Sequence, residues 1–125
     1  MPILDVEIIL EPGEELKPGL AAELANTAAE IFQSGPQQTW LKLRPLPQAN
    51  YAENGGTAEN VKPVFVSILK AQQPTLAQKQ KEVHQLAQRF AQICGRPAAH
   101  IHILYLPEGN GRIAFGGQLL VPEGR

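Results

Sequence analysis

The residue with the clearest capacity for chemistry is Pro2, which directly follows the initiator methionine. If Met1 is removed, the Pro2 nitrogen becomes a secondary amine at the start of a strand-like apolar run, residues 3–10. An α-amine has a pKa of about 7.7–8.0, and burial in an apolar pocket lowers it by penalising the charged form. Such an amine can act as a general base at neutral pH. The alternative is that Pro2 only begins an edge strand, where a missing N–H does no harm.

A second set of candidates lies on residues 39–46, where polar and apolar side chains alternate. Trp40, Lys42 and Arg44 share one face of the predicted strand, and leucines occupy the other. Two cations on one strand face can bind a carboxylate, and they can equally form a solvated rim.

Tyr51 lies in a loop, residues 47–60, that is rich in Asn and Gly. Loops held by a rigid scaffold often carry function, and a phenol can donate a hydrogen bond to a developing enolate. A role in packing is the alternative for Tyr51.

His100 and His102 fall on one face of a third alternating segment, residues 100–105. No carboxylate or cysteine accompanies them at the spacing of metal ligands. We therefore expect no metal and no cofactor.

The composition is that of a globular chain, with 43% apolar residues and a formal net charge of −1 over 125 residues. Basic and acidic residues are interspersed, and no apolar run approaches the roughly 18 residues of a membrane span. The N-terminus lacks a signal-peptide pattern, and the single cysteine, Cys94, cannot form an intramolecular disulfide. We expect a cytoplasmic protein that binds neither nucleic acid nor membrane.

The elements that position these residues occur twice. The first half predicts a strand over 2–10, a helix over 17–33 that ends at Gly35, and a strand over 39–46. The second half predicts a strand over 63–69, a helix opened by a Thr75/Gln78 capping box and ended by Gly95, and a strand over 100–105. The second helix has an apolar face of Leu76, Val83, Leu86, Ala87, Phe90 and Ile93.

The two halves are related by a shift of about 60 residues. Pro2 and Pro63 are 61 positions apart, Gly35 and Gly95 are 60 apart, and both halves end in Gly-Gly, at 55–56 and 116–117. We predict one domain over 1–125, with pseudo-repeats at about 2–60 and 61–120. The fold class is α/β (α+β): a tandem β-α-β repeat.

Because β-α-β crossovers are right-handed, two such units form a four-stranded sheet with both helices on one face. The other face is left bare and partly apolar. Assembly around a symmetry axis is the expected way to cover it.

The opening Met-Pro, the doubled β-α-β unit and the tail Gly-Arg-Ile-Ala-Phe-Gly-Gly-Gln-Leu together resemble the tautomerase superfamily. This group includes the 4-oxalocrotonate tautomerases, 5-carboxymethyl-2-hydroxymuconate isomerase and macrophage migration inhibitory factor (MIF). The resemblance covers almost the whole chain and is most specific at Pro2 and at residues 102–117. It implies a tautomerase/MIF-like fold, a homotrimer with pockets between subunits, and an amino-terminal proline that moves a proton between carbon and oxygen.

Carried over by position, Pro2 matches the catalytic proline of the family. Lys42 and His102 fall at or beside the strand position of a substrate-binding arginine, where a lysine binds a carboxylate only as a point charge. A second arginine of the family would fall near Pro12, and this chain has none there. The general base is thus kept while the substrate-binding set differs, which argues against a dicarboxylate such as oxalocrotonate.

The tail carries two further candidates. Ile113 lies where the family has an aromatic wall, and Phe115 is close by. The resemblance places Arg112 near the mouth of the pocket, although an arginine beside a glycine turn is also typical of a plain surface.

Two functions follow from these residues. The first is a tautomerase or isomerase acting on a small keto or enol carboxylic acid, with Pro2 as base and then acid. Substrate-binding candidates are Lys42, Arg44, Tyr51, His102, Arg112 and Phe115. The second is a ferredoxin-like module without catalysis that binds a ligand or assembles through its bare sheet face.

Overall fold

The computed structural model describes residues 2–122. The first half contains β1 (Ile3–Leu10), α1 (Leu20–Phe32), β2 (Trp40–Pro47) and a 3-10 turn, η1 (Gln48–Asn50). The second half contains β3 (Val64–Leu69), α2 (Leu76–Cys94), a 3-10 turn, η2 (Ala98–His100), and β4 (Ile101–Tyr105). A small hairpin follows, made of β5 (Ala114–Phe115) and β6 (Gln118–Leu119).

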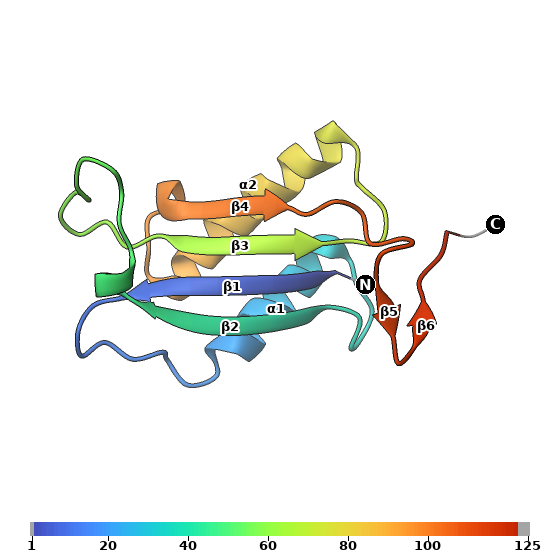
Figure 1. Ribbon diagram of the computed structural model, residues 1–125, viewed down its shortest axis with the longest axis horizontal. Coiled ribbons are helices and arrows are strands. Elements are labelled where there is room, and N and C mark those ends of the chain that lie inside the picture. Colours follow the sequence, from blue (N-terminus) through green and yellow to red (C-terminus); the bar gives the residue numbers. More distant parts are fainter. Residues whose placement is uncertain (1, 123–125) are drawn as a thin grey trace.

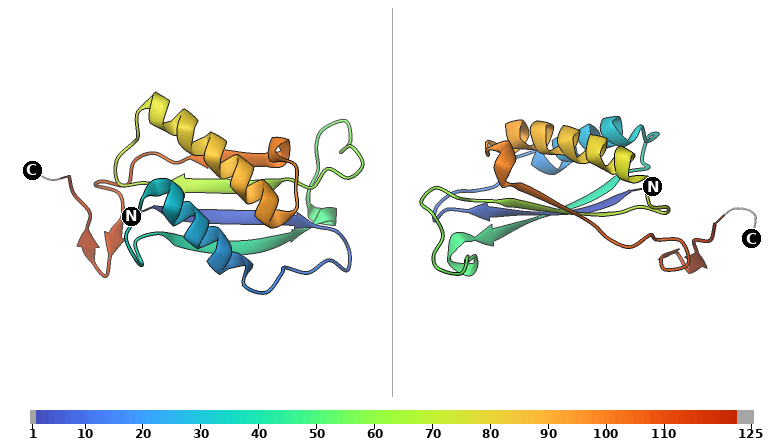
Figure 2. Two further views of the ribbon diagram at one scale, coloured as in Figure 1. Left: turned by 180° about the vertical axis from the view of Figure 1, so that it is seen from behind. Right: turned by 90° about the horizontal axis from the view of Figure 1, so that it is seen from above.

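The four long strands form one mixed sheet in the order β2-β1-β3-β4. The strands within each half are parallel, and the halves meet through the antiparallel pair β1 and β3. Both helices cover the same face of this sheet (Figures 1 and 2). The predicted fold, a tandem β-α-β repeat with two helices on one face, is confirmed.

The hydrophobic core lies between the sheet and the two helices. Every second residue of the two central strands is buried there: Leu4, Val6 and Ile8 on β1, and Val64, Val66 and Ile68 on β3. The helices contribute Leu24, Ala28, Leu86 and Phe90, none of which has any exposed surface. Burial of each large aliphatic or aromatic side chain contributes about 1.5–3 kcal/mol, so this layer holds the sheet on which the site residues lie.

Helix α1 is shorter than the predicted 17–33. It begins at Leu20 because Gly19 has a φ of 79°, a left-handed conformation that a right-handed helix cannot include. The predicted end at Gly35 is also wrong: Gln33 takes the left-handed cap position, with a φ of 55°.

Helix α2 begins and ends as predicted. The Thr75 hydroxyl accepts a hydrogen bond from the Gln78 N–H at 3.1 Å, and Gly95 ends the helix with a φ of 67°. The prediction that Leu76 lies on the apolar face is wrong, because this first-turn side chain is 73% exposed.

Strand β4 begins at Ile101, one residue later than predicted. His100 belongs to η2, where its N–H donates to the Pro97 carbonyl at 2.9 Å. The two histidines therefore do not share a strand face, and only His102 lies on the sheet surface that the helices leave uncovered.

That uncovered surface, which we call the open face, combines charged and large apolar side chains. Alternation along the strands places these residues on it: Ile3, Asp5, Glu7, Trp40, Lys42, Arg44, Phe65, Ser67, His102 and Leu104. Trp40, Phe65 and Leu104 are 46%, 37% and 58% exposed, so apolar area remains uncovered in the single chain.

The C-terminal hairpin projects beyond the end of the sheet, on the side where β1 starts (Figures 1 and 2). Its turn is made by Gly116 and Gly117, whose φ values of 58° and 86° favour glycine. In the part of the chain that the structure covers, no helix is long and apolar enough to cross a membrane.

Candidate functional site

Pro2 is buried and lies immediately before β1. Its carbonyl oxygen accepts a hydrogen bond from the Trp40 N–H at 3.0 Å, which continues the β1–β2 ladder by one residue. The backbone of Pro2 is therefore fixed at the end of the sheet where β2 begins and β3 finishes (Figure 1).

Phe115 reaches the same end of the sheet through Trp40. The two rings meet edge to face, with centroids 5.0 Å apart and an interplanar angle of 88°. The indole N–H of Trp40 donates to the Gln37 carbonyl at 3.0 Å, so the ring has a fixed orientation. The structure thus brings Phe115 to the end of the sheet that holds Pro2.

Lys42 and Arg44 lie on the open face, opposite two acidic residues of β1. The register pairs Asp5 with Lys42 and Glu7 with Arg44. Asp5 Oδ1 is 3.2 Å from Lys42 Nζ and 3.6 Å from Arg44 Nη1, and Glu7 Oε2 is 3.9 Å from Arg44 Nε. The two cations are therefore present at the surface but already have carboxylate partners within the chain.

Tyr51 and His102 lie toward the other end of the open face from Pro2. The Tyr51 ring centroid is 6.0 Å from that of Phe65, which in turn is 5.4 Å from that of His102. The Tyr51 hydroxyl donates to Glu53 Oε2 at 2.5 Å, and this hydrogen bond raises the pKa of the phenol.

Arg112 lies between β4 and β5 and is exposed. Its backbone N–H donates to the Gly109 carbonyl at 2.8 Å, which makes the turn that leads into the hairpin. The position is close in sequence to Phe115, but no contact of its guanidinium with Pro2 is present among the described residues.

The predicted site residues therefore fall into separate groups along the sheet. Pro2 and Phe115 are at one end, Tyr51 and His102 are toward the other, and Lys42 and Arg44 lie between them on the open face. The two end groups therefore do not lie side by side on the single chain.

The sequence did not predict a buried ionic cluster made of Lys70, Glu82 and Tyr105. Glu82 is 2% exposed, and its carboxylate accepts hydrogen bonds from Lys70 Nζ at 2.8 Å, from Gln78 Nε2 at 3.2 Å and from the Tyr105 hydroxyl. Burial alone would raise the pKa of Glu82, but these hydrogen bonds outweigh it and hold the pKa below its usual range. Burial and the bond to Glu82 raise the pKa of Tyr105.

A signal for this cluster was present in the sequence. Glu82 precedes Leu86 and Phe90 by four and eight residues, so it lies on the apolar stripe of α2. A glutamate at such a position needs a buried partner.

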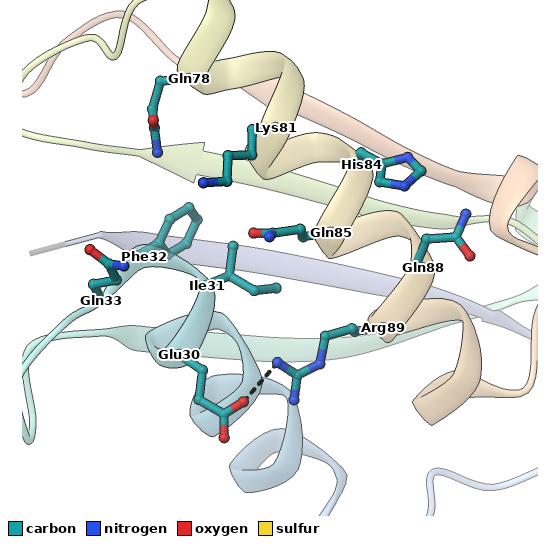
Figure 3. A pocket seen from close by; sticks show the side chains of 10 residues that line it. All are labelled: Glu30, Ile31, Phe32, Gln33, Gln78, Lys81, His84, Gln85, Gln88 and Arg89. Atoms are coloured by element: carbon teal, nitrogen blue, oxygen red, sulfur yellow. Dashed lines mark ion pairs between the residues drawn. The ribbon is translucent and has the colours of Figure 1, made fainter.

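Pro2 lines neither of the two larger hollows of the described chain. One is a polar groove of about 510 Å³ between α1 and α2, on the outer side of the helix layer (Figure 3). Lys81 and Gln85 border it, together with the ion pair in which Arg89 Nη1 lies 2.7 Å from Glu30 Oε2. The other, of about 570 Å³, is apolar and lies between residues 10–16 and 45–49, at the opposite end of the sheet. Among residues 2–122, no three His, Cys, Asp or Glu side chains converge as metal ligands would.

Solved structures that match this fold include members of the tautomerase superfamily. A fused 4-oxalocrotonate tautomerase (4-OT), described as an asymmetric trimer, is 20% identical, with a TM-score of 0.73 and coverage of 92% of this chain and 94% of its own. Pt0534, described as inactivated by 2-oxo-3-pentynoate, is 13% identical, with a TM-score of 0.73 and coverage of 94% of both chains. MIF from Oncomelania hupensis is 18% identical, with a TM-score of 0.73 and coverage of 95% of this chain and 81% of its own.

No protein-family model and no curated protein matches the chain. The resemblance seen in the sequence is confirmed as a tautomerase-superfamily fold.

Proposed function

We propose that this chain is a tautomerase-like enzyme in which Pro2, after removal of Met1, acts as general base and then general acid. The observation that carries the proposal is the position of Pro2: it is buried, lies immediately before β1, and its carbonyl oxygen accepts a hydrogen bond from the Trp40 N–H at 3.0 Å. Solved structures of the same fold include a protein inactivated by an electrophilic keto acid and a fused 4-OT, which supports a proton-transfer reaction.

The proposed reaction interconverts the enol and keto forms of a small carboxylic acid. The Pro2 amine takes the proton of the enol hydroxyl, and the electron pair of that O–H bond forms the carbonyl. The C=C π pair of the former enol takes a proton from the resulting prolyl ammonium to form the new C–H bond, which restores the neutral amine. The proton count balances, and no oxidant or cofactor is needed.

The substrate carboxylate needs a cation, and Lys42, Arg44 and Arg112 are the candidates. Lys42 and Arg44 lie in a ladder with Asp5 and Glu7, so binding of a carboxylate there competes with these internal partners. A single carboxylate is therefore a better fit than a dicarboxylate. Tyr51 and His102 belong to the same open face and are proposed to contact substrate from a neighbouring copy.

We propose a homotrimer as the active form. The open face carries exposed Trp40, Phe65 and Leu104 next to charged residues, which is typical of a surface covered by assembly. Three solved structures of this fold are described as trimers of fused 4-OT. Such an assembly brings the Tyr51 end of one chain near the Pro2 end of another only if the open faces pack around a common axis.

The proposal is tested by alkylation with 2-oxo-3-pentynoate, the compound named for Pt0534. The Pro2 amine of the processed chain is expected to add to the alkyne, and peptide mass spectrometry is expected to find one adduct on Pro2. The chain that retains Met1 has an amide nitrogen at Pro2 and is the matched control, which should stay unmodified there. Equal labelling of both forms, or none on Pro2 of the processed chain, would contradict the proposal.

A binding or assembly module without catalysis is the second candidate. It is favoured by one observation: the cations of the open face already have carboxylate partners, so they need not bind a substrate. A trimer that does not react at Pro2 would support this candidate.

A further inference from the structure

The buried cluster of Lys70, Glu82 and Tyr105 joins three elements at one end of the sheet. Lys70 directly follows β3, Glu82 belongs to α2, and Tyr105 is the last residue of β4. Lys70 Nζ also lies 4.5 Å from the centroid of the Phe32 ring, at the end of α1. The side chain of Lys70 is 20% exposed and that of Glu82 is 3% exposed, so the ammonium has a fixed position between α1, α2 and the sheet.

The strand register places this cluster beside Pro2. The antiparallel β1–β3 ladder ends with Ile3 opposite Leu69; extending the register by one step, to the residues just outside both strands, would set Pro2 opposite Lys70. Residues opposite each other in an antiparallel pair have Cβ atoms about 4.5–5.5 Å apart. Leu4 and Ile68, the pair two steps earlier, both point into the core, so by alternation Pro2 and Lys70 lie on the helix side as well.

The other charged groups on the elements around this end of the sheet are paired with other residues or exposed. On the open side of the sheet, Asp5 and Lys42 are paired with each other. Helix α1 presents the uncharged Phe32 at its end, and Lys79 of α2 lies over the Tyr105 ring at 5.3 Å. The segment between β4 and β5 carries Glu108 and Arg112, both exposed. Lys70 is thus the partly buried cation that the extended register brings next to Pro2, and Glu82 is its counter-charge.

A buried ion pair is a costly way to fill a core, because both charges lose their hydration. An apolar pair at positions 70 and 82 would pack against Phe32 without that cost. The presence of the pair beside a candidate base therefore points to a role for its charge.

We propose that Lys70 is a positioning residue for Pro2: its ammonium, held in place by Glu82 and Phe32, keeps positive charge beside the Pro2 amine and favours the unprotonated base. The inference rests on the proposed function, because it concerns the same amine. It adds a residue that touches neither substrate nor reacting atoms and acts through Pro2.

The test measures the pKa of the Pro2 amine directly, by the ¹⁵N chemical shift of Pro2 in processed, ¹⁵N-proline-labelled trimer. Glu82→Gln leaves the Lys70 ammonium without its counter-charge and is expected to lower this pKa by about 0.5–1 unit. The double variant Lys70→Met/Glu82→Gln removes both charges without leaving either unpaired, and it is expected to raise the pKa by a similar amount. Lys70→Arg keeps the charge and should leave the pKa close to that of the wild type.

The matched control is Lys62→Met. Lys62 is 17% exposed and forms the same kind of pair, 3.4 Å from Glu11 and 3.5 Å from Glu14, but at the opposite end of the sheet. It should leave the Pro2 pKa unchanged. Shifts of opposite sign in the two Glu82 variants, with none in Lys62→Met, support the proposal. Shifts of one sign, or no shift in either, overturn it.

Failure of the proposed function gives a different result. The ¹⁵N titration reports the Pro2 pKa whether or not the protein turns over a substrate. If the Pro2 pKa shifts in opposite directions in the two Glu82 variants but the processed chain has no activity on a keto–enol probe, the role of Lys70 is supported and the proposed enzymatic function is contradicted.

Discussion

Asp5 Oδ1 is 3.2 Å from Lys42 Nζ, on adjacent strands of the open face. The same oxygen is 3.6 Å from Arg44 Nη1, yet it is buried and accepts no well-formed hydrogen bond among the described residues. The contact is therefore ionic and incompletely satisfied. A substrate carboxylate can compete for these cations by offering the hydrogen bonds that Asp5 does not make.

Lys42→Ala and Arg44→Ala are expected to raise KM for a carboxylate substrate by about 10-fold to 100-fold, because a charge-assisted hydrogen bond contributes about 1.5–3 kcal/mol. Their melting temperatures should barely change, since the two side chains are 67% and 55% exposed and such ion pairs contribute little to stability. Steady-state kinetics and thermal melts check both statements. Lys17→Ala is the control, because Lys17 is a similarly exposed lysine paired with Glu23 at 3.7 Å. If both variants melt much lower and turn over normally, the anion site lies elsewhere.

The open face is expected to be the surface that assembles. Leu104→Glu puts a carboxylate into an apolar part of this face and should convert the trimer, about three times 13.6 kDa, into monomers. Leu76→Glu changes an even more exposed leucine, 73% against 58%, on α2 and outside the open face, so it should leave the trimer intact. Sedimentation equilibrium at micromolar concentration distinguishes these outcomes. A wild-type chain that sediments as a monomer would remove the assembly argument.

Glu82 is expected to make the protein sensitive to acid. Its pKa in the folded chain lies below that of an ordinary glutamate, so its contribution to stability is present above about pH 4.3 and is lost as the pH falls through the lowered folded pKa. The free energy of unfolding should therefore drop more steeply below pH 4.3 in the wild type than in Glu82→Gln. Urea unfolding at a series of pH values, at constant protein concentration, measures this. If the free energy of unfolding depends on pH in the same way in both proteins, the pKa of Glu82 does not differ between the folded and the unfolded chain.

Arg96 is expected to be the most important cation for stability. Its side chain is 8% exposed and donates to three backbone carbonyls: Ile9 at 2.9 Å, Lys62 at 3.1 Å and Cys94 at 3.2 Å. Arg96→Ala leaves these acceptors without their donor and should lower the free energy of unfolding by about 2–4 kcal/mol. Arg89→Ala removes an exposed arginine paired with Glu30 at 2.7 Å and should change it by less than about 1 kcal/mol. Equal losses in the two variants would contradict this.

The fold was predictable because its main signals are local and doubled. The Thr75 cap, the Gly95 stop and the proline before each central strand are local signals, and the structure places them as expected. The predicted bounds of α1 and β4 are wrong where a nearby residue, not the predicted one, ends the helix or starts the strand. Gln33 adopts the left-handed cap two residues before the predicted Gly35, and the turn after Pro97 delays β4 by one residue.

The site was less predictable because it depends on contacts between distant segments. Alternation correctly placed Lys42 and Arg44 on one face, but only the register with β1 shows that Asp5 and Glu7 lie opposite them. The hydrogen-bond partners of Glu82 come from three places in the chain. The position of Glu82 on the apolar stripe of α2 predicts that it needs a partner but does not identify which residues supply it.

The central claim is that the nitrogen of Pro2 is the base, and one comparison tests it most directly. Turnover of phenylenolpyruvate is measured as a function of pH for the processed chain, the Met1-retaining chain and Pro2→Ala. The processed chain should be most active, with a rate that rises with pH through the pKa of the amine. Pro2→Ala keeps a primary amine and should retain part of the activity, whereas the Met1-retaining chain should have none. Equal rates for all three forms would contradict the account and leave Pro2 as only the start of a strand.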